Sequence, residues 1–575
     1  MKFFQKILSR ANFWPLVIVV FFGLLAGRTL LPSGYFNMHD DLQMMRQLEL
    51  EKCFLDLQIP CRWVPDMGYG FGFPLFNFYP PLPYLFGEVF RLVGFTFVVT
   101  VKLTFILSFV ASGITMYFLA KEFFGKTGGV LSSVFYIWAP YHSVDVFVRG
   151  AMNEAWALAW FPLILWAGYS LVTGHKKQLT RWTITLALSW AALFLSHNLM
   201  VLIFTPIFGA WCLIFLYREK KWERIKNLIL AGLLTLGLSA FFTFPAVLEQ
   251  KYVQVNTLIV GYYEYIAHFA SLSQLLISRF WGYGASVWAE DDGMPFPVGH
   301  MHWILSLVIA AMALYGLWKT RRKKSIIRNS SLIVLFFIAV GWLSTFMAHS
   351  RSTPIWQLLP PMKFVQFPWR FLTLSTLSFS FIVGALTLFI KNKKLSYLIT
   401  GLLMLGLLLF NWDYFKPEKG KLGPLTDEQK FTAAAWELQQ TAGIYDYLPK
   451  DAIQAPQEPR KFLAEILEGE GIITDESEGT TWAKFKATIM SEGAKTRIGI
   501  FKFPNWRAFV DGKEVTNYID KSEVWGRMYI DLPKGEHQIS LKLFNTPVRT
   551  VSNIISLVTW SLLLSFPYWK KRWLS

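Results

Sequence analysis

The chain has 575 residues, of which 54% are hydrophobic and only 16% are charged. In soluble globular proteins about a quarter of all residues are charged, so this composition excludes an ordinary soluble protein. The formal net charge of +18 would suggest a nucleic-acid partner in a soluble chain. Here the basic residues fall in short breaks between apolar runs, which predicts a multi-pass membrane protein that binds no nucleic acid.

Apolar runs that can cross a bilayer as helices recur along the chain, about twelve in all. Placing every basic cluster between them on the cytoplasmic side gives a consistent map with both termini in the cytoplasm. The predicted spans are roughly 13–32, 99–120, 128–140, 152–173, 182–197, 199–217, 227–247, 303–318, 331–349, 371–390, 396–412 and 552–569. The proline-rich stretch 80–94 is predicted to be a helix at the membrane surface rather than a span.

The first exterior loop, about 33–98, starts just beyond the first span with His39, Asp40 and Asp41. An amphipathic helix is expected over 41–57. The Gly-, Pro- and aromatic-rich run 63–81 that follows suits either an interfacial anchor or the wall of a groove. Cys53 and Cys61 in this loop could form a disulfide in an oxidising compartment, and the sequence leaves that open.

Asp40 and Asp41 allow three interpretations. One aspartate could cap the following helix. The pair could instead hold Mg²⁺ or Mn²⁺, which prefer carboxylate oxygens. One aspartate could also be a general base, because nearby lipid and a second carboxylate raise its proton affinity. A single cap needs one aspartate, so the pair beside His39 favours a site.

Arg149, Glu154 and Arg370 all map to the exterior ends of predicted spans. An arginine at this level can simply extend to lipid headgroups. The alternative is that Arg149 and Arg370 present a fork of donors to a lipid phosphate. Glu154 can pair with Arg149 or orient an acceptor. His142, Asp145 and His197 lie at the same level and are interpreted as structural.

The segment 413–550 mixes charges of both signs and is predicted to be an exterior soluble domain. Its second half alternates like strands over 482–489, 496–503, 507–510, 528–532 and 537–544. Asp511-Gly512 and the stretch 533–535 are expected turns, which together predict a small β-sandwich. We therefore divide the chain into a membrane domain (1–412), this domain (413–550), and a last span with a basic tail (551–575).

Several motifs resemble bacterial membrane proteins known as "6-pyruvoyl-tetrahydropterin synthase-related", although nothing in the chain resembles a soluble pterin enzyme. They are Met38-His39-Asp40-Asp41, Arg62-Trp63-Val64-Pro65, the run from Gly70 to Tyr84, and Arg149-Gly150-Ala151-Met152-Asn153-Glu154. The chain is also similar to YfhO-like membrane proteins, in Phe367-Pro368-Trp369-Arg370-Phe371 and in the tail 503–513 and 532–537.

Both groups resemble the GT-C superfamily of integral-membrane glycosyltransferases. This resemblance implies a polyprenyl-phosphate sugar donor and an acidic residue of the first exterior loop that serves the acceptor or a metal, here Asp40 or Asp41. It implies a phosphate-side role for Arg370, and Arg149 and Glu154 match a motif of the family. We also expect Arg149, Glu154 and His39 to bind substrate or phosphate.

The expected protein is an inverting hexosyl- or pentosyltransferase of the bacterial plasma membrane that modifies an envelope glycan, lipid or protein on the exterior face. No cofactor other than Mg²⁺ or Mn²⁺ is implied. A lipid or solute transporter, or flippase, is an alternative, although the spans lack the buried ionisable residues and broken repeats common in ion-coupled carriers. A non-catalytic envelope scaffold is a third hypothesis.

Overall fold

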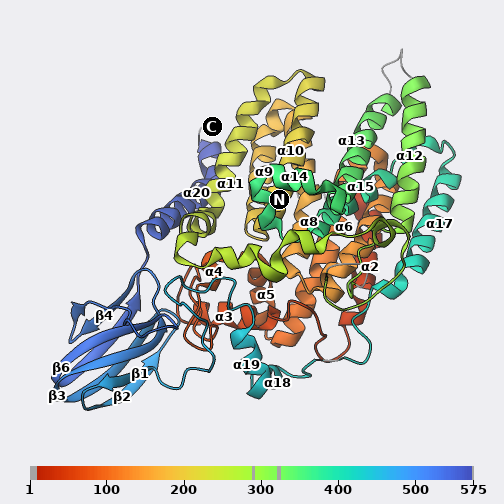
Figure 1. Ribbon diagram of the computed structural model, residues 1–575. Helices are drawn as coiled ribbons and strands as arrows, with labels where there is room; N and C mark the ends of the chain where they lie inside the picture. The colour runs from red at the N-terminus through yellow and green to blue at the C-terminus, as the bar shows by residue number, and fades with distance from the viewer. Residues whose placement is uncertain (1–9, 288–291, 320–325, 422, 573–575) are drawn as a thin grey trace. The chain divides into compact units, whose positions relative to one another are not determined.

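The computed structural model describes residues 10–287, 292–319, 326–421 and 423–572. The chain forms two compact units (Figure 1). The first unit comprises residues 1–41, 98–235 and 261–425, and the second comprises 42–97, 236–260 and 426–575. The first exterior loop and the C-terminal strands therefore belong to the same unit, although they are distant in sequence.

The first unit is a bundle of long helices joined by short helical turns. Its helices are α2 (Arg10–Ala26), α6 (Phe97–Ile137), α7 (Pro140–Ser143), α8 (Met152–Thr173), α9 (Leu179–Phe194), α10 (Asn198–Glu219), α12 (His300–Lys319), α13 (Ile326–Met347), α14 (Thr353–Leu358), α15 (Leu372–Val383), α16 (Leu386–Phe389) and α17 (Lys393–Asn411). Helices α8, α9 and α10 pack together, as do α12, α13 and α15.

Nine helices within the described ranges are long and apolar enough to cross a membrane, and Asn12–Ala26 is a shorter apolar helix. The nine stretches are Phe97–Ile137, Met152–Thr173, Asn198–Glu219, Trp222–Leu248, His300–Lys319, Ser330–Met347, Pro368–Phe389, Lys393–Tyr414 and Pro547–Ser565. The predicted class, a polytopic α-helical membrane protein, is confirmed. The count of about twelve stays a prediction, partly because α6 covers two predicted spans, which meet at a kink where Gly125 has φ 70° and ψ −174°.

The second unit combines parts of the first exterior loop with a β domain and the last helix. Its helices are α3 (Gln43–Leu55), α4 (Leu75–Phe78), α5 (Leu82–Leu92), the end of α11 (Ile225–Leu248), α18 (Asp427–Lys430), α19 (Ala433–Thr441) and α20 (Pro547–Arg572). Helix α20 packs along α11, where the Ser556 hydroxyl donates to the Gly237 carbonyl oxygen at 2.9 Å. The helices predicted over 41–57 and within 80–94 are thus confirmed as α3 and α5.

The β domain is one antiparallel sheet in the order β1-β3-β6-β4-β5, with β2 also paired to β3. Its strands are β1 (Ala464–Glu468), β2 (Gly471–Glu478), β3 (Trp482–Phe501), β4 (Trp506–Val510), β5 (Lys513–Val515) and β6 (Arg527–Leu543). The pairing of β3 with β6 shifts register between Ile489 and Gly493 and again between Ile498 and Phe501. Side chains from both halves of these long strands, including Phe485 and Ile530, enter one hydrophobic cluster.

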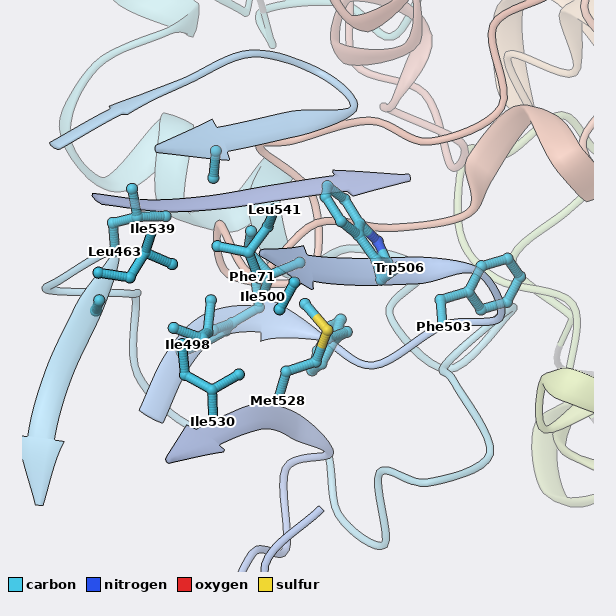
Figure 2. Close-up of a cluster of buried hydrophobic side chains, with 14 of the residues drawn as sticks. Phe71, Leu463, Ile498, Ile500, Phe503, Trp506, Met528, Ile530, Ile539 and Leu541 are labelled. Carbon is cyan, nitrogen blue, oxygen red and sulfur yellow. The ribbon is translucent and has the colours of Figure 1, made fainter. Parts of the chain in front are cut away.

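Figure 2 shows this cluster, to which Ile498 and Met528 of one half and Ile539 and Leu541 of the other half all contribute. The predicted β-rich domain before the last helix is therefore confirmed, with both halves of the sheet sharing a core. The expected turn at 533–535 is wrong, because these residues continue β6 opposite the register shift. The Asp511-Gly512 turn is confirmed, and it joins β4 to β5.

Candidate functional site

The segment that carries Asp40 is joined to the segment that carries Arg149 by main-chain hydrogen bonds. The His39 amide donates to the Val148 carbonyl oxygen at 3.1 Å, and the Asp40 amide donates to the Arg149 carbonyl oxygen at 2.9 Å. Both segments belong to the first unit. Two motifs more than a hundred residues apart in sequence are thus brought together.

The Arg149 segment adopts an unusual backbone. Residues Val144–Val148 form a π-helix (η2), and the Arg149 amide donates to the Val144 carbonyl oxygen at 2.8 Å. Single π turns are rare and occur frequently at functional sites. Gly150 follows with φ 61°, and a Cβ added there would lie 2.5 Å from Cγ of Met38. Glycine is required on both counts, since an L side chain would be strained and would collide with Met38.

Glu154 lies at the centre of a buried charge cluster. Its side chain is fully buried, Oε2 lies 2.8 Å from Nη1 of Arg149, and Oε1 accepts a hydrogen bond from the Tyr141 hydroxyl at 2.7 Å. Asp145 contacts Arg149 from the other side, with Oδ1 2.5 Å from Nη1. The sequence-based interpretation that Glu154 pairs with Arg149 is therefore confirmed.

Arg370 reaches the same carboxylate from another part of the first unit. It lies in the short helical turn η12 (Pro368–Phe371), and its Nε is 3.5 Å from Oε2 of Glu154. Its Nη1 donates to the Val365 carbonyl oxygen at 2.7 Å and to Oε1 of Gln366 at 2.9 Å. Two arginines predicted separately therefore share one carboxylate.

Aromatic rings cover both guanidinium groups. The Arg149 guanidinium lies 4.4 Å from the centre of the Trp369 ring, and that of Arg370 lies 4.9 Å from the centre of the Phe367 ring. These two rings are stacked on each other at 4.7 Å. The aromatic faces attract the cations and hold them in fixed orientations.

Burial, followed by the nearby Glu154 carboxylate, raises the pKa of Asp145 well above its usual range. Burial opposes the charge of Arg149, but Glu154, Tyr141 and Asp145 outweigh it and raise the Arg149 pKa. Two guanidinium groups, those of Arg149 and Arg370, meet at the Glu154 carboxylate. Two such donor groups held close together suit a phosphate.

His39 is held beside this cluster. Its Nε2 lies 3.1 Å from the Tyr283 carbonyl oxygen, and burial lowers the pKa of the ring. His197 approaches Glu154 at 3.9 Å, but burial lowers its pKa to about 3, so it faces Glu154 as a neutral ring.

The N-cap position of α3 falls on Leu42, whose side chain makes no cap bond. Capping of this helix by Asp40 or Asp41 stays a prediction. Within the described residues, no group of three or more His, Cys, Asp and Glu side chains is arranged to hold a metal ion. The metal role of Asp40 and Asp41 stays a prediction.

Sequence reasoning missed two members of the cluster. Tyr141 donates to Glu154 and also accepts from Nη1 of Arg149 at 3.2 Å, while the Trp369 indole donates to the Ser286 hydroxyl at 3.3 Å. No regular spacing links Tyr141 to either partner, because the π turn interrupts the helical repeat. Asp145 and Arg149 stand four residues apart, and that spacing could have indicated their ion pair.

In the second unit, Cys53 and Cys61 form a disulfide, which answers the question that the sequence left open. The aromatic run of the first loop is neither exposed like an anchor nor spread along a groove. Trp63 packs on Phe503 with ring centres 5.5 Å apart, and Phe71 packs on Phe501 at 5.7 Å. These loop residues belong to the core of the β domain.

No family model and no curated protein matches this chain. Among solved structures, similar chains include ArnT from Cupriavidus metallidurans bound to undecaprenyl phosphate, at 13% identity over 69% of this chain and 63% of that one, with a TM-score of 0.40. The Archaeoglobus fulgidus oligosaccharyltransferase tethered to an acceptor peptide is 12% identical over 72% of this chain and 57% of that one, with a TM-score of 0.40. The mycobacterial arabinofuranosyltransferase AftD is 15% identical over 71% of this chain and 27% of that one, with a TM-score of 0.42.

The chain thus spans less than two thirds of each of these proteins. Likenesses at this level identify no activity, so the assignment of function depends on the site itself.

Proposed function

We propose that this protein is a GT-C membrane glycosyltransferase that transfers a sugar from a polyprenyl-phosphate donor to an envelope acceptor on the exterior face. The observation that carries the proposal is the main-chain bond from Asp40 to Arg149, whose guanidinium shares Glu154 with Arg370. The hydrogen-bonded segments therefore carry two features side by side. One is a carboxylate pair suited to accept a proton, and the other is a cationic cluster suited to bind phosphate. The motifs that resemble the two groups of bacterial membrane proteins include these same residues: Asp40, Arg149 and Glu154 for one group and Arg370 for the other.

In the proposed reaction, the acceptor hydroxyl attacks the anomeric carbon while Asp40 or Asp41 accepts its proton. The new bond joins the acceptor oxygen to the sugar, and the bond between the anomeric carbon and the phosphate oxygen breaks. The electron pair leaves with polyprenyl phosphate, whose developing charge Arg370 and Arg149 stabilise. A single displacement inverts the anomeric configuration.

Asp40 and Asp41 are also the residues that would hold a divalent cation. Mg²⁺ and Mn²⁺ commonly use one or two carboxylates and complete their coordination with water and substrate phosphate, so this pair fits such an ion. When bound, the cation would neutralise charge on the leaving phosphate. Chelation followed by separate addition of Mg²⁺ and Mn²⁺ measures whether transfer needs it.

The disulfide and the loop distribution support an exterior site in the bacterial plasma membrane. Disulfides persist in oxidising compartments and are rare in the cytosol. Cys53 and Cys61 lie in the loop that follows Asp40 and Asp41, on the side that the charge map assigns to the exterior. Lipid-linked donor, envelope acceptor and membrane lipids are then the expected partners.

Replacing Asp40 and Asp41 separately by asparagine tests the proposal. The purified full chain in proteoliposomes is given a panel of labelled polyprenyl-phosphate sugars and an envelope extract, and released polyprenyl phosphate is measured. Loss of the base lowers the rate by about 10²- to 10⁴-fold in at least one variant. Asp413→Asn is the matched control, because the Asp413 side chain is 83% exposed in the same unit.

Full activity in both aspartate variants would contradict the assignment of the base. Movement of intact lipid-linked sugar across the bilayer without transfer would indicate a transporter instead, and binding without either reaction would indicate a scaffold.

A further inference from the structure

The second unit contains an open cleft of about 380 Å³, and none of its lining residues belongs to the charge cluster around Glu154. It lies where the end of α3 and the segment 65–66 meet the turn between β2 and β3. Its lining residues are Lys52, Leu55, Asp56, Pro65, Asp66, Glu478, Gly479, Thr480 and Trp482. All of them belong to the same compact unit.

The walls of this cleft are fixed by hydrogen bonds across it. One carboxylate oxygen of Asp56 accepts from the Thr480 amide and the Thr480 hydroxyl, both at 2.7 Å. The other accepts from the Trp482 indole at 2.9 Å. A Cβ added at Gly479 would lie 2.7 Å from the Asp56 carboxylate, so glycine lets the turn approach this closely. The surface is preorganised, so binding of a ligand would cost little conformational entropy of the protein.

The lining chemistry suits a sugar better than a lipid or an anion. The Trp482 ring, which is partly exposed, offers an apolar face of the kind that packs against the C–H face of a pyranose. Carboxylate oxygens of Asp66 and Glu478 and the Thr480 hydroxyl are groups that accept or exchange hydrogen bonds with sugar hydroxyls. Three carboxylates and one ammonium line the cleft, and that ammonium is already paired with Asp66, so the lining offers little to attract an anionic ligand.

The acidic wall is itself supported from behind. Lys52 pairs with Asp66, and Arg460 pairs with Glu478, so both carboxylates are held in place while remaining partly exposed. Behind Asp66, Glu49 is fully buried, and its Oε2 accepts from the Asp66 amide at 3.4 Å. The exposed carboxylates are therefore oriented by neighbours rather than free to rotate.

We propose that this cleft is a subsite for a neutral glycan segment of the acceptor, which deepens and rests on the proposed glycosyltransferase function. The subsite selects uncharged sugars over uronates and phosphorylated glycans, because Lys52 and Arg460 are already paired with its carboxylates. It holds acceptor and takes no part in bond making.

The test uses the purified full chain in detergent micelles and saturation-transfer NMR. The ligands are neutral tetrasaccharides of glucose, mannose and galactose, a tetragalacturonate, and an oligolysine peptide. At least one neutral tetrasaccharide is expected to bind, and tetragalacturonate is expected not to bind.

Leu55→Arg provides the decisive variant, because Leu55 is 78% exposed and lines the cleft, so the change fills it without disturbing the core. Its guanidinium is expected to pair with the cleft carboxylates and to weaken tetrasaccharide binding by about tenfold or more. Leu438→Arg is the matched control, since Leu438 is 64% exposed on α19 and lies outside the cleft lining. Its binding is expected to equal that of the wild type.

Three results would overturn the proposal. They are equal tetrasaccharide binding by the two leucine variants, binding of tetragalacturonate in preference to neutral sugars, and binding of oligolysine alone. Absence of any tetrasaccharide signal from the wild-type chain would also overturn it. Asp40→Asn and Asp41→Asn separate the two proposals. These variants are expected to lose sugar transfer while they still bind tetrasaccharide like the wild type. In an active preparation, Leu55→Arg is expected to raise the acceptor KM and leave kcat unchanged.

Discussion

Glu154 is the shared counter-ion of two buried arginines, and its removal is expected to be costly. Arg149 is 7% exposed and Arg370 is 9% exposed, so neither guanidinium can recover full hydration when its partner is lost. Breaking a buried pair in this way typically costs about 3–5 kcal/mol, more than the pair itself contributes. Glu154→Gln should therefore lower the thermal unfolding midpoint of the full chain in detergent, followed by intrinsic fluorescence.

The control for this prediction is Asp413→Asn. Asp413 pairs with Lys416 at 2.9 Å, but its side chain is 83% exposed, and exposed pairs contribute little to stability. If Glu154→Gln and Asp413→Asn unfold at the same temperature, Glu154 does not act as a buried counter-ion.

His142 makes the stability of the fold sensitive to acid. The ring packs on Phe109 with ring centres 4.6 Å apart, and burial lowers its pKa from 6.5 to about 4. Above pH 6.5 the ring is neutral in both the folded and the unfolded chain. As the pH falls from 6.5 to 4, His142 becomes protonated in the unfolded chain but stays mostly neutral in the folded chain. The free energy of unfolding therefore falls, by roughly 3 kcal/mol at pH 4.

His142→Gln keeps a donor for the Tyr136 carbonyl oxygen, which lies 3.2 Å from Nδ1, but it does not titrate. Unfolding midpoints measured at several pH values should converge for the variant and the wild type as the pH falls from 6.5 to 4. Parallel curves over that interval would show that His142 contributes nothing to the acid sensitivity.

At the scale of elements, the sequence located most helices but misjudged one turn. The basic residues between the apolar runs 99–120 and 128–140 separate them into two spans, and α6 is interrupted between them at Gly125, whose φ of 70° and ψ of −174° are non-helical. Pro533 and Gly535 have the composition of a turn, but β6 passes through them. Turn residues allow a sharp change of direction, and only the pairing partner decides whether the strand ends there.

Gly535 is expected to be the residue that permits this bend in β6. Its φ is 127°, which an L side chain rarely adopts, so Gly535→Ala should destabilise the β domain by about 1–2 kcal/mol. The measurement is the thermal unfolding midpoint of the full chain. Gly493→Ala is the control, because Gly493 pairs with Pro533 across the same bend, has no positive φ, and has 3.6 Å of space for a Cβ. Equal unfolding midpoints for the two variants would show that the backbone conformation of Gly535 is not the reason for the loss of stability.

At the scale of the whole molecule, the sequence could indicate the membrane class and the β-rich domain, but not the assignment of the first loop to the β domain. The first-loop ring of Trp63 lies 5.8 Å from Trp506, more than four hundred residues along the chain. Local periodicity carries no information about such a pairing. The candidate site shows the same limit, because Arg149, Glu154 and Arg370 were each predicted, while the contact of both arginines with Glu154 followed only from the fold.

The orientation in the membrane is the property on which an exterior site depends, and cysteine labelling can measure it directly. The charge map places Lys177 in a cytoplasmic connection and Glu476 on the exterior β domain, and both side chains are exposed. The native cysteines interfere little, since Cys53 and Cys61 are bridged and Cys212 is buried. In intact bacterial cells, a membrane-impermeant maleimide should label Glu476→Cys and should label Lys177→Cys only after permeabilisation. The reverse pattern would place Asp40 and Asp41 in the cytoplasm and would exclude a donor presented on the outer face.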